Sequence, residues 1–366
     1  MVVLALVLVL ENEHVLEFEH DNEQEHERVI ALDAMGGDLA PAATVEGALR
    51  AHRERGVEVL LVGDETRLSL ELRRLGAGET ELRIHHASEV VEMDEPAGQA
   101  LRKKKDSSIR VCFDLCKSGE ASGMVSAGNS GAVMAGALFV LGRLEGVDRP
   151  CIGGSLPTLG GCGRAVLVDM GANVECTAEQ IVQFALMGEV YARRILGVVR
   201  PRVGVVANGE EEGKGTDLTR AAATALRRPE SGVDFRGYVE GKDVFGGAFD
   251  VIATDGFTGN VLLKTAEGAV WAFGQLLKRQ IKVSPLASAG ALLLKSSLEQ
   301  VRKRVDYEEV GGAPLLGVRG VGLIAHGRST PRAILNALSG AEAFAVERLQ
   351  DELSGAAKRA SALFSH

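Results

Sequence analysis

Short apolar runs alternate with polar, glycine-containing turns along most of this chain. Runs rich in Val, Ile and Leu, bounded by turn residues, predict buried strands. The predicted strands lie at 29–32, 57–62, 82–85, 123–127, 165–168, 203–207, 249–252 and 321–325. Helical segments separate them. Strands that alternate with helices predict an α/β fold, in which helices cover both faces of a mainly parallel sheet in a three-layer α/β/α sandwich.

Helix starts are marked by proline and by small polar residues. Pro41 suits the first turn of a helix that runs to about Arg55. Glu95–Pro96 breaks the chain before a helix that carries the basic run Arg102–Lys105. Most of the other predicted helices follow a predicted strand directly, as a βα fold requires.

Polar turns end at least six of the predicted strands. The turns lie at 33–38, 128–132, 169–173, 208–216, 254–260 and 326–329. A strand, a glycine turn and a helix start together direct unpaired backbone N–H groups at an anion, and ligands of open α/β sheets bind at strand carboxyl ends. Ordinary βα turn chemistry explains any one turn. The set favours a crevice that binds phosphate through backbone donors and helix dipoles.

The candidate phosphate-binding residues all belong to these turns. They are Asp33, Gly36, Gly37, Asn129, Ser130, Asp169, Asn173, Glu210, Asp255, Gly256, Thr258, Gly259 and His326.

Composition narrows the class of protein. The 366 residues are 46% hydrophobic and 25% charged, as in ordinary globular proteins. The five cysteines include no CxxC pair, which favours reduced thiols over disulfides or metal ligands. With 45 glycines and few aromatic residues, the chain has many tight loops and few stacking surfaces, so we expect no nucleic-acid partner.

The net charge of −9 comes mostly from the first 28 residues, which hold eight acidic side chains and one basic one. Their first ten residues are apolar, well short of the roughly 20 that a membrane helix needs. An acidic stretch follows where a signal peptide would have a cleavage site. We interpret residues 1–28 as an appendage with no part in the fold.

Residues 271–309 form a predicted basic amphipathic helical segment, and within it residues 271–305 hold seven Lys or Arg and a single Glu. The pattern from 275 to 305 predicts two helices that meet at Ser284–Pro285. Apolar residues recur at helical spacing on the second helix at Leu294, Leu298, Val301 and Val305. The predicted membrane-contact residues are Leu292, Leu293, Leu294 and Lys295. A basic amphipathic pair of this kind can lie in an anionic membrane interface, pack as a dimer or core helix pair, or bind an acidic protein.

No catalytic nucleophile stands out, because the sequence has no GxSxG, no HExxH and no cysteine beside a histidine. Such an enzyme must activate a substrate that is itself nucleophilic, and inorganic phosphate qualifies. Its attack on a thioester needs a cation for the dianion and a donor for the developing oxyanion. Lys214 is the candidate cation and Asn260 the candidate donor. A solvated loop lysine and a helix-capping asparagine are the alternative interpretations.

Nine motifs together resemble the phosphate acyltransferases of bacterial phospholipid synthesis. They are DAMGGD (33–38), MDEPA (93–97), RKKKDSS (102–108), SAGNSGA (126–132), DMGANVE (169–175), NGEEEGKGTD (208–217), TDGFTGNVLLKTAEG (254–268), GGAPLLG (311–317) and AHG (325–327). The likeness covers residues 29–349 and leaves 350–366 as a C-terminal tail. One departure, Ala207–Asn208, falls beside the Lys214 loop.

This resemblance implies transfer of a long-chain acyl group from acyl-acyl carrier protein to phosphate, with Lys214 holding phosphate and Asn260 activating the carbonyl. It implies a fold related to isopropylmalate dehydrogenases and phosphotransacetylases, a homodimer, and neither metal nor cofactor. It further implies a cytoplasmic protein, peripherally bound to the inner face of the membrane, that hands acyl phosphate to a glycerol-3-phosphate acyltransferase.

Three other functions remain open from the residues. A phosphotransacetylase-like enzyme would use acyl-coenzyme A in the same crevice. A decarboxylating dehydrogenase of related fold would need clustered metal-binding aspartates, which the sequence does not show. A non-catalytic, membrane-associated scaffold could bind acyl chains. Lys214 together with Asn260 favours an enzyme.

Overall fold

The computed structural model describes residues 28–78, 80–305 and 311–365. The acidic appendage predicted at 1–28 therefore lies outside the described residues, apart from Arg28. The end of the basic segment, 306–309, lies outside them as well.

One mixed sheet runs through the described part of the chain, with eleven strands in the order β3-β2-β1-β4-β11-β10-β5-β6-β9-β7-β8. The strands are β1 Ile30–Asp33, β2 Val59–Gly63, β3 Arg83–His86, β4 Gly123–Ser126, β5 Cys151–Pro157, β6 Arg164–Val168, β7 Arg202–Val206, β8 Asp234–Val239, β9 Val251–Ala253, β10 Ala313–Leu316 and β11 Gly322–Ile324. All eight predicted strands are confirmed. Strands β5, β8 and β10 were not predicted, because glycine or proline interrupts each of them and weakens the strand pattern.

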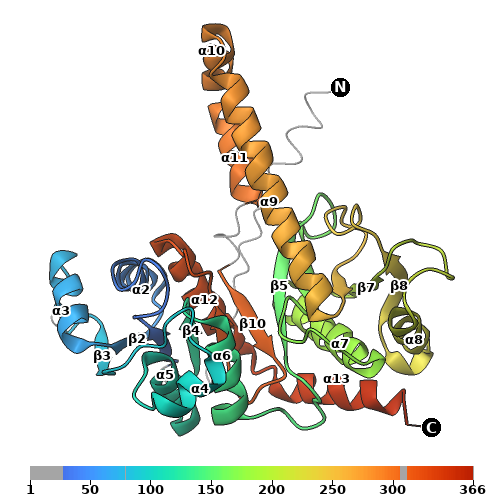
Figure 1. The fold of residues 1–366 in the computed structure, drawn as a ribbon, viewed down its shortest axis with the longest axis horizontal. Helices are drawn as coiled ribbons and strands as arrows, with labels where there is room; N and C mark the ends of the chain where they lie inside the picture. Colours follow the sequence, from blue (N-terminus) through green and yellow to red (C-terminus); the bar gives the residue numbers. More distant parts are fainter. Residues whose placement is uncertain (1–27, 79, 306–310, 366) are drawn as a thin grey trace.

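Helices cover both faces of this sheet, as the three-layer prediction requires (Figure 1). Their bounds are α2 Ala42–Arg55, α3 Glu65–Arg74, α4 Ala97–Lys103, α5 Ser108–Ser118, α6 Ser130–Gly136, α7 Ala178–Arg194, α8 Asp217–Leu226, α9 Gly256–Ile281, α10 Pro285–Leu293, α11 Lys295–Val305, α12 Pro331–Glu347 and α13 Gln350–Ala362. Ile30 and Leu32 of β1 face one core with α2, α3, α7, α8, α12 and α13, while Ala31 faces a second core with α4, α5 and α6. This alternation is what a strand buried on both faces produces.

Strand direction reverses in the middle of the sheet. The pairings β11–β10, β10–β5 and β5–β6 are antiparallel, and the other pairings among the described strands are parallel. We call β3-β2-β1-β4-β11 the first half and β6-β9-β7-β8 the second half. Because three reversals separate them, the strands of the two halves run in opposite directions. The strand-end turns therefore form two sets rather than the single row that one parallel sheet would give.

Two helix boundaries differ from prediction. Helix α4 ends at Lys103, because Lys104 leaves helical geometry and its Nζ donates to the Val90 carbonyl at 2.7 Å and pairs with Glu95. In the basic segment, Ser284 caps α10 and Pro285 begins it, as predicted. The second helix is then broken at Leu294 (φ −90°, ψ 6°), where a leucine run gives way to Lys295–Ser296–Ser297. Serines favour helix starts over helix interiors, which suits a new helix here.

Helices α9, α10 and α11 form a hairpin that leaves the body of the molecule, with α10 at its tip (Figure 1). From residue 268 to 280 every residue of α9 is exposed. The segment set apart as a C-terminal tail is helix α13, whose buried face of Leu353, Ala356, Ala357 and Ala360 joins the core beside α7.

Candidate active site

The first-half turns are built around Asp33 at the end of β1. Its carboxylate is fully buried and accepts hydrogen bonds from Ser126 Oγ at 2.6 Å and from the Met35 N–H at 3.3 Å. Burial raises the pKa of Asp33, and these hydrogen bonds oppose the rise. A Cβ at Gly36 would collide with this carboxylate and stand 2.8 Å from the Gly128 nitrogen. The turns after β1 and β4 therefore touch, and only glycine fits between them.

The turn after β11 completes this set. Gly37 has φ +101°, a conformation that favours glycine, and a Cβ there would lie 3.0 Å from the Gly327 carbonyl oxygen. The Asp38 N–H donates to that oxygen at 2.7 Å. His326 is next to it in the chain, exposed, with its Nδ1 3.2 Å from the Arg328 nitrogen. The turns holding Asp33, Asn129 and His326 thus lie together, at the ends of adjacent strands.

Both amide atoms of the Asn129 side chain form hydrogen bonds within the protein. Its Oδ1 accepts the Ala132 N–H at 3.0 Å and so caps α6, while its Nδ2 lies 3.1–3.2 Å from the carbonyl oxygens of Glu92, Met93 and Glu95. The amide therefore holds the 92–95 segment against the turn. Ser130, the next residue, is exposed in the first turn of α6.

In the second half, Asp169 shapes the turn after β6. Its Oδ1 accepts N–H groups from Ile152, Gly171 and Ala172 at 3.0–3.1 Å, and its Oδ2 accepts both the backbone N–H and the side-chain amide of Asn173 at 2.7 and 2.9 Å. The carboxylate is fully buried, and burial raises the pKa of Asp169 against these hydrogen bonds. Asp169 and Asn173 therefore position the turn rather than face the solvent.

Helix α9 begins against this turn. The helix cap is Asp255, whose oxygens accept the Thr258 N–H at 2.8 Å and the Thr258 hydroxyl at 2.7 Å. The Gly256 N–H donates to the Asn173 carbonyl at 2.7 Å. A Cβ at Gly259 would collide with the Asp169 carbonyl oxygen. Two turns predicted separately thus form one packed unit.

Asn260 lies at the exposed rim of that unit. Its side chain lies near Gly171, where an added Cβ would be 3.5 Å from the Asn260 Cβ. Asp255 has the capping role that was the alternative interpretation of Asn260. No hydrogen bond between described residues engages the Asn260 amide, so both of its N–H donors can turn to a ligand.

Lys214 comes from the neighbouring turn after β7. Its side chain is 47% exposed, and its Nζ is 4.0 Å from Glu211 Oε2. A Cβ at Gly209 would lie 2.6 Å from Lys214 Cγ, so glycine at this position leaves room for the aliphatic part of the lysine side chain. Asn208, at the departure from the family pattern, anchors the loop by accepting the Gly215 N–H at 2.8 Å. Glu210 pairs instead with Lys242 at 2.6 Å.

The structure therefore brings Lys214 and Asn260 to the same edge of the sheet. Strands β6, β9 and β7 are parallel neighbours, with Val168 beside Ala253 and Val205 beside Ala253. Their carboxyl ends meet at one edge. Within the described ranges, no hydrogen bond or ion pair joins this second-half set to the first-half turns. Two residues that support the turns, Ser126 and Asn208, were not among the candidate residues. The Asn208–Gly209 pair was a turn signal for the second.

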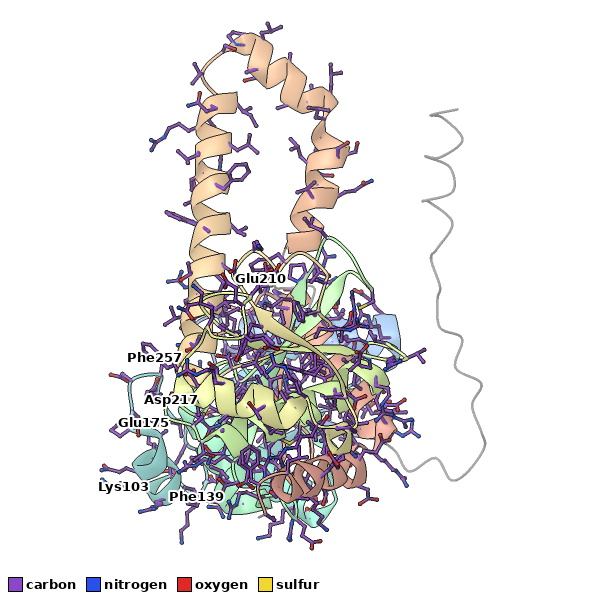
Figure 2. The ribbon with its side chains drawn as sticks, turned by 90° about the vertical axis from the view of Figure 1, so that its right-hand side faces the viewer. Lys103, Phe139, Glu175, Glu210, Asp217 and Phe257 are labelled. Atoms are coloured by element: carbon purple, nitrogen blue, oxygen red, sulfur yellow. The ribbon has the colours of Figure 1, made fainter. Side chains whose placement is uncertain are left out.

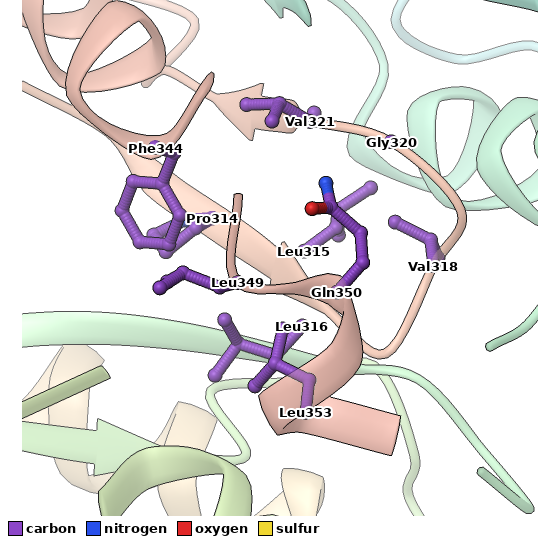
Figure 3. Close-up of a pocket in the computed structure, with 11 residues that line it drawn as sticks. Pro314, Leu315, Leu316, Val318, Gly320, Val321, Phe344, Leu349, Gln350 and Leu353 are labelled. Carbon is purple, nitrogen blue, oxygen red and sulfur yellow. The ribbon is translucent and has the colours of Figure 1, made fainter. Parts of the chain in front are cut away.

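A small apolar cavity lies away from both turn sets. It holds about 10 Å3, between β10 and the helices α12 and α13, with Leu315, Phe344 and Leu353 in its wall and the Gln350 side chain beside it (Figure 3). That volume suits about one water molecule. None of its lining residues belongs to the six predicted turns, and its size is that of a packing gap.

A family model described as fatty acid synthesis protein matches residues 28–350. A phosphate acyltransferase of Anaeromyxobacter sp. (strain Fw109-5) is 57% identical over 335 residues, covering 91% of this chain and 92% of that protein. The chain belongs to this family. A phosphate acyltransferase of Myxococcus xanthus (strain DK1622) is 55% identical, with 91% and 94% covered. The resemblance seen in the motifs is thereby confirmed.

Solved structures confirm the fold class. A phosphotransacetylase from Streptococcus pyogenes matches with a TM-score of 0.59 at 16% identity, covering 88% of this chain and 94% of that one. A branched-chain phosphotransacylase from Enterococcus faecalis V583 matches with a TM-score of 0.50 at 11% identity, covering 88% and 99%. At these identities the likeness shows the architecture of this family member and no more.

Proposed function

We propose that this protein transfers an acyl group from acyl-acyl carrier protein to inorganic phosphate, and so makes acyl phosphate for phospholipid synthesis. The observation that carries the proposal is that Lys214 and Asn260 lie at the same edge of the sheet. They are an exposed ammonium and an exposed amide at adjacent strand ends, while Asp169, Asn173 and Asp255 around them are occupied in holding the turns. Membership of a family whose relatives are named phosphate acyltransferase supports it.

The reaction needs no group from the protein to change its bonding. A phosphate oxygen attacks the thioester carbonyl carbon and forms the C–O bond. The C–S bond then breaks, and its electron pair leaves with sulfur, which takes up the proton that the hydrogen phosphate loses and becomes the carrier thiol. Lys214 offsets the charge of the phosphate dianion. The Asn260 amide donates to the oxyanion that develops on the carbonyl oxygen.

The state of Cys176, a cysteine that contacts this unit, favours direct attack by phosphate. Cys176 Sγ lies 3.4 Å from the Asn173 carbonyl oxygen, and burial raises the pKa of its thiol to about 11. A thiol with that pKa is almost entirely protonated near neutral pH, and the thiolate is the nucleophilic form. Phosphate, which is already anionic, is the better nucleophile at this site.

The test supplies long-chain acyl-acyl carrier protein and phosphate without added metal, and traps acyl phosphate with hydroxylamine. We expect phosphate-dependent hydroxamate from the wild type and from Lys264→Ala, a control that removes an exposed lysine of α9, which pairs with Glu267. If the wild type forms no hydroxamate, the proposed enzymatic function is refuted, and the non-catalytic, acyl-binding scaffold is the function that remains. A parallel arm with acyl-coenzyme A tests the phosphotransacetylase-like alternative, which the fold also suits.

The hairpin supports two further parts of the proposal. At its tip, Leu293 is 86% exposed, next to Leu292, Leu294 and Lys295, an arrangement suited to an anionic membrane surface. On the shaft, Trp271 is 69% exposed and Phe273 is 68% exposed, and such aromatic residues suit contact with a second copy in a homodimer. No helix in the described ranges combines the length and apolar character needed to cross a bilayer.

We therefore propose a cytoplasmic homodimer that contacts the inner membrane face peripherally and passes acyl phosphate to a glycerol-3-phosphate acyltransferase. Leu293→Glu with Leu294→Glu should abolish sedimentation with anionic vesicles and leave turnover of the soluble acyl-carrier substrate mostly intact. A double variant that becomes monomeric or unfolds would instead make these leucines part of an interface or core.

A further inference from the structure

The proposed function leaves the basic run on α4 unexplained. Between Ala97 and Lys105 the chain has four basic residues and no acidic one. Lys104 turns inward to Glu95 and the Val90 carbonyl. Arg102, Lys103 and Lys105 are exposed, and no ion pair among the described residues engages them. They form a cationic surface that the packing of α4, through Ala100 and Leu101, does not require.

An exposed aromatic residue completes this surface. Phe139, in the π-helical segment Ala137–Leu141, is 66% exposed, and the Arg102 guanidinium lies 5.6 Å from its ring centroid. Arginine and aromatic side chains are enriched among the residues that dominate protein interfaces. We call Arg102, Lys103, Lys105 and Phe139 the α4 surface.

The α4 surface is tied to the first-half turns through Asn129. Its amide holds the carbonyl oxygens of 92–95, immediately before α4 begins. Ala97, the first residue of α4, has its Cβ 3.1 Å from where a Cβ on Gly131 would stand. The helix therefore starts against the turn after β4, and its exposed residues follow within about 10 Å along the helix.

The α4 surface also lies on the same side of the molecule as the start of α9. Figure 2 shows Lys103 and Phe139 along the side that carries Glu175 and Phe257. Phe257 is in the first turn of α9 and Asn260 is in the next. A protein bound to the α4 surface would thus stand on the side from which a flexible thioester arm can approach Asn260.

We propose that the α4 surface docks the acyl carrier protein, an inference that rests on the proposed function. The carrier is an acidic protein that presents its acyl chain as a thioester, so exposed cations attract it and orient it. The hairpin cations are a poorer place for it, because Lys278 lies about 27 Å along α9 from Asn260. They suit the membrane surface instead.

The test separates the carrier from its thioester. Lys103→Glu with Lys105→Glu should raise the KM for acyl-acyl carrier protein about tenfold or more at low salt. The same variant should use acyl-pantetheine, an uncharged small thioester, as the wild type does. The matched control, Lys278→Glu with Arg279→Glu on the hairpin, should leave the KM for both donors unchanged. Phe139→Ala should weaken binding of labelled carrier in a fluorescence anisotropy titration.

Two results would overturn the docking proposal: an unchanged carrier KM in the α4 double variant together with unchanged carrier affinity in Phe139→Ala, or a raised carrier KM in the hairpin variant. Both leave the proposed function standing, because the wild type still makes acyl phosphate from each donor. A wild type that turns over neither acyl-acyl carrier protein nor acyl-pantetheine would refute the proposed function itself.

Discussion

The two sets of strand-end turns use the same residue types for different purposes. In the first half, Asp33 is buried against Ser126, and Asn129 caps α6 and holds residues 92–95. In the second half, Asp169 and Asp255 are equally committed to backbone groups, but Asn260 and Lys214 stay exposed beside them. The difference shows that aspartate, asparagine and glycine here build scaffolds in both halves. We infer that the chemistry belongs to the half that also presents a cation.

The largest expected effect is that of Lys214→Ala. Removing the cation that offsets phosphate charge in the transition state should lower turnover by about 10²-fold or more. The melting temperature should stay close to that of the wild type, because the lysine is exposed and its one ion pair with a described residue is 4.0 Å long. Hydroxamate formation and thermal melting measure the two quantities. Near-normal turnover would place the phosphate site elsewhere.

Asn260→Ala should lower turnover by about 10²-fold, with a smaller effect on the KM for phosphate, because its amide acts on the carbonyl oxygen. Steady-state kinetics with phosphate as the varied substrate measure both. A change confined to the phosphate KM would contradict the role given to this amide.

Asn129→Ala tests the asparagine of the first half, which caps α6, whereas Asn260 of the second half is exposed. Losing the α6 cap should cost about 1 kcal/mol, and losing the hold on residues 92–95 should add to that. Denaturant unfolding should show the loss of stability. A drop in turnover as large as that of Asn260→Ala, in a variant that stays folded, would make the first half a second catalytic centre.

Ser130→Ala should have the smallest effect. The hydroxyl is exposed at the start of α6, and a single neutral hydrogen bond is worth roughly a tenfold change in rate at most. The phosphate KM of this variant shows whether the first-half turn touches phosphate at all. A loss of turnover as large as that of Lys214→Ala would contradict the assignment of the chemistry to the second half.

Local signals made much of this fold predictable. All eight predicted strands exist, and Ser284 and Pro285 begin α10 as expected, because caps and βα turns depend on a few neighbouring residues. The reversal of strand direction depends on β5 and β10, whose pairing is non-local and whose sequences are interrupted by glycine or proline. The sequence offered no signal for that reversal, and so none for the division of the turns into two sets.

The candidate site was predictable at the level of segments and less so for individual side chains. Asp169 and Asn173 look like ligand residues in the sequence, but Asp169 accepts N–H groups of its own turn and of β5. The Asn173 amide donates to Asp169 and to the Pro150 carbonyl. The structure leaves the Asn260 side chain exposed, and the residue that caps α9 is Asp255. Which of several similar polar residues remains available depends on tertiary contacts, and these cannot be read from the turn motif alone.

The central claim is that phosphate, held by Lys214, attacks the thioester directly. The most direct measurement is the release of carrier thiol from acyl-acyl carrier protein by stoichiometric enzyme, with and without phosphate. We expect no thiol release without phosphate, and phosphate-dependent release that is matched by trapped hydroxamate and lost in Lys214→Ala. A burst of thiol equal to the enzyme concentration in the absence of phosphate would show an acyl-enzyme intermediate and contradict the claim.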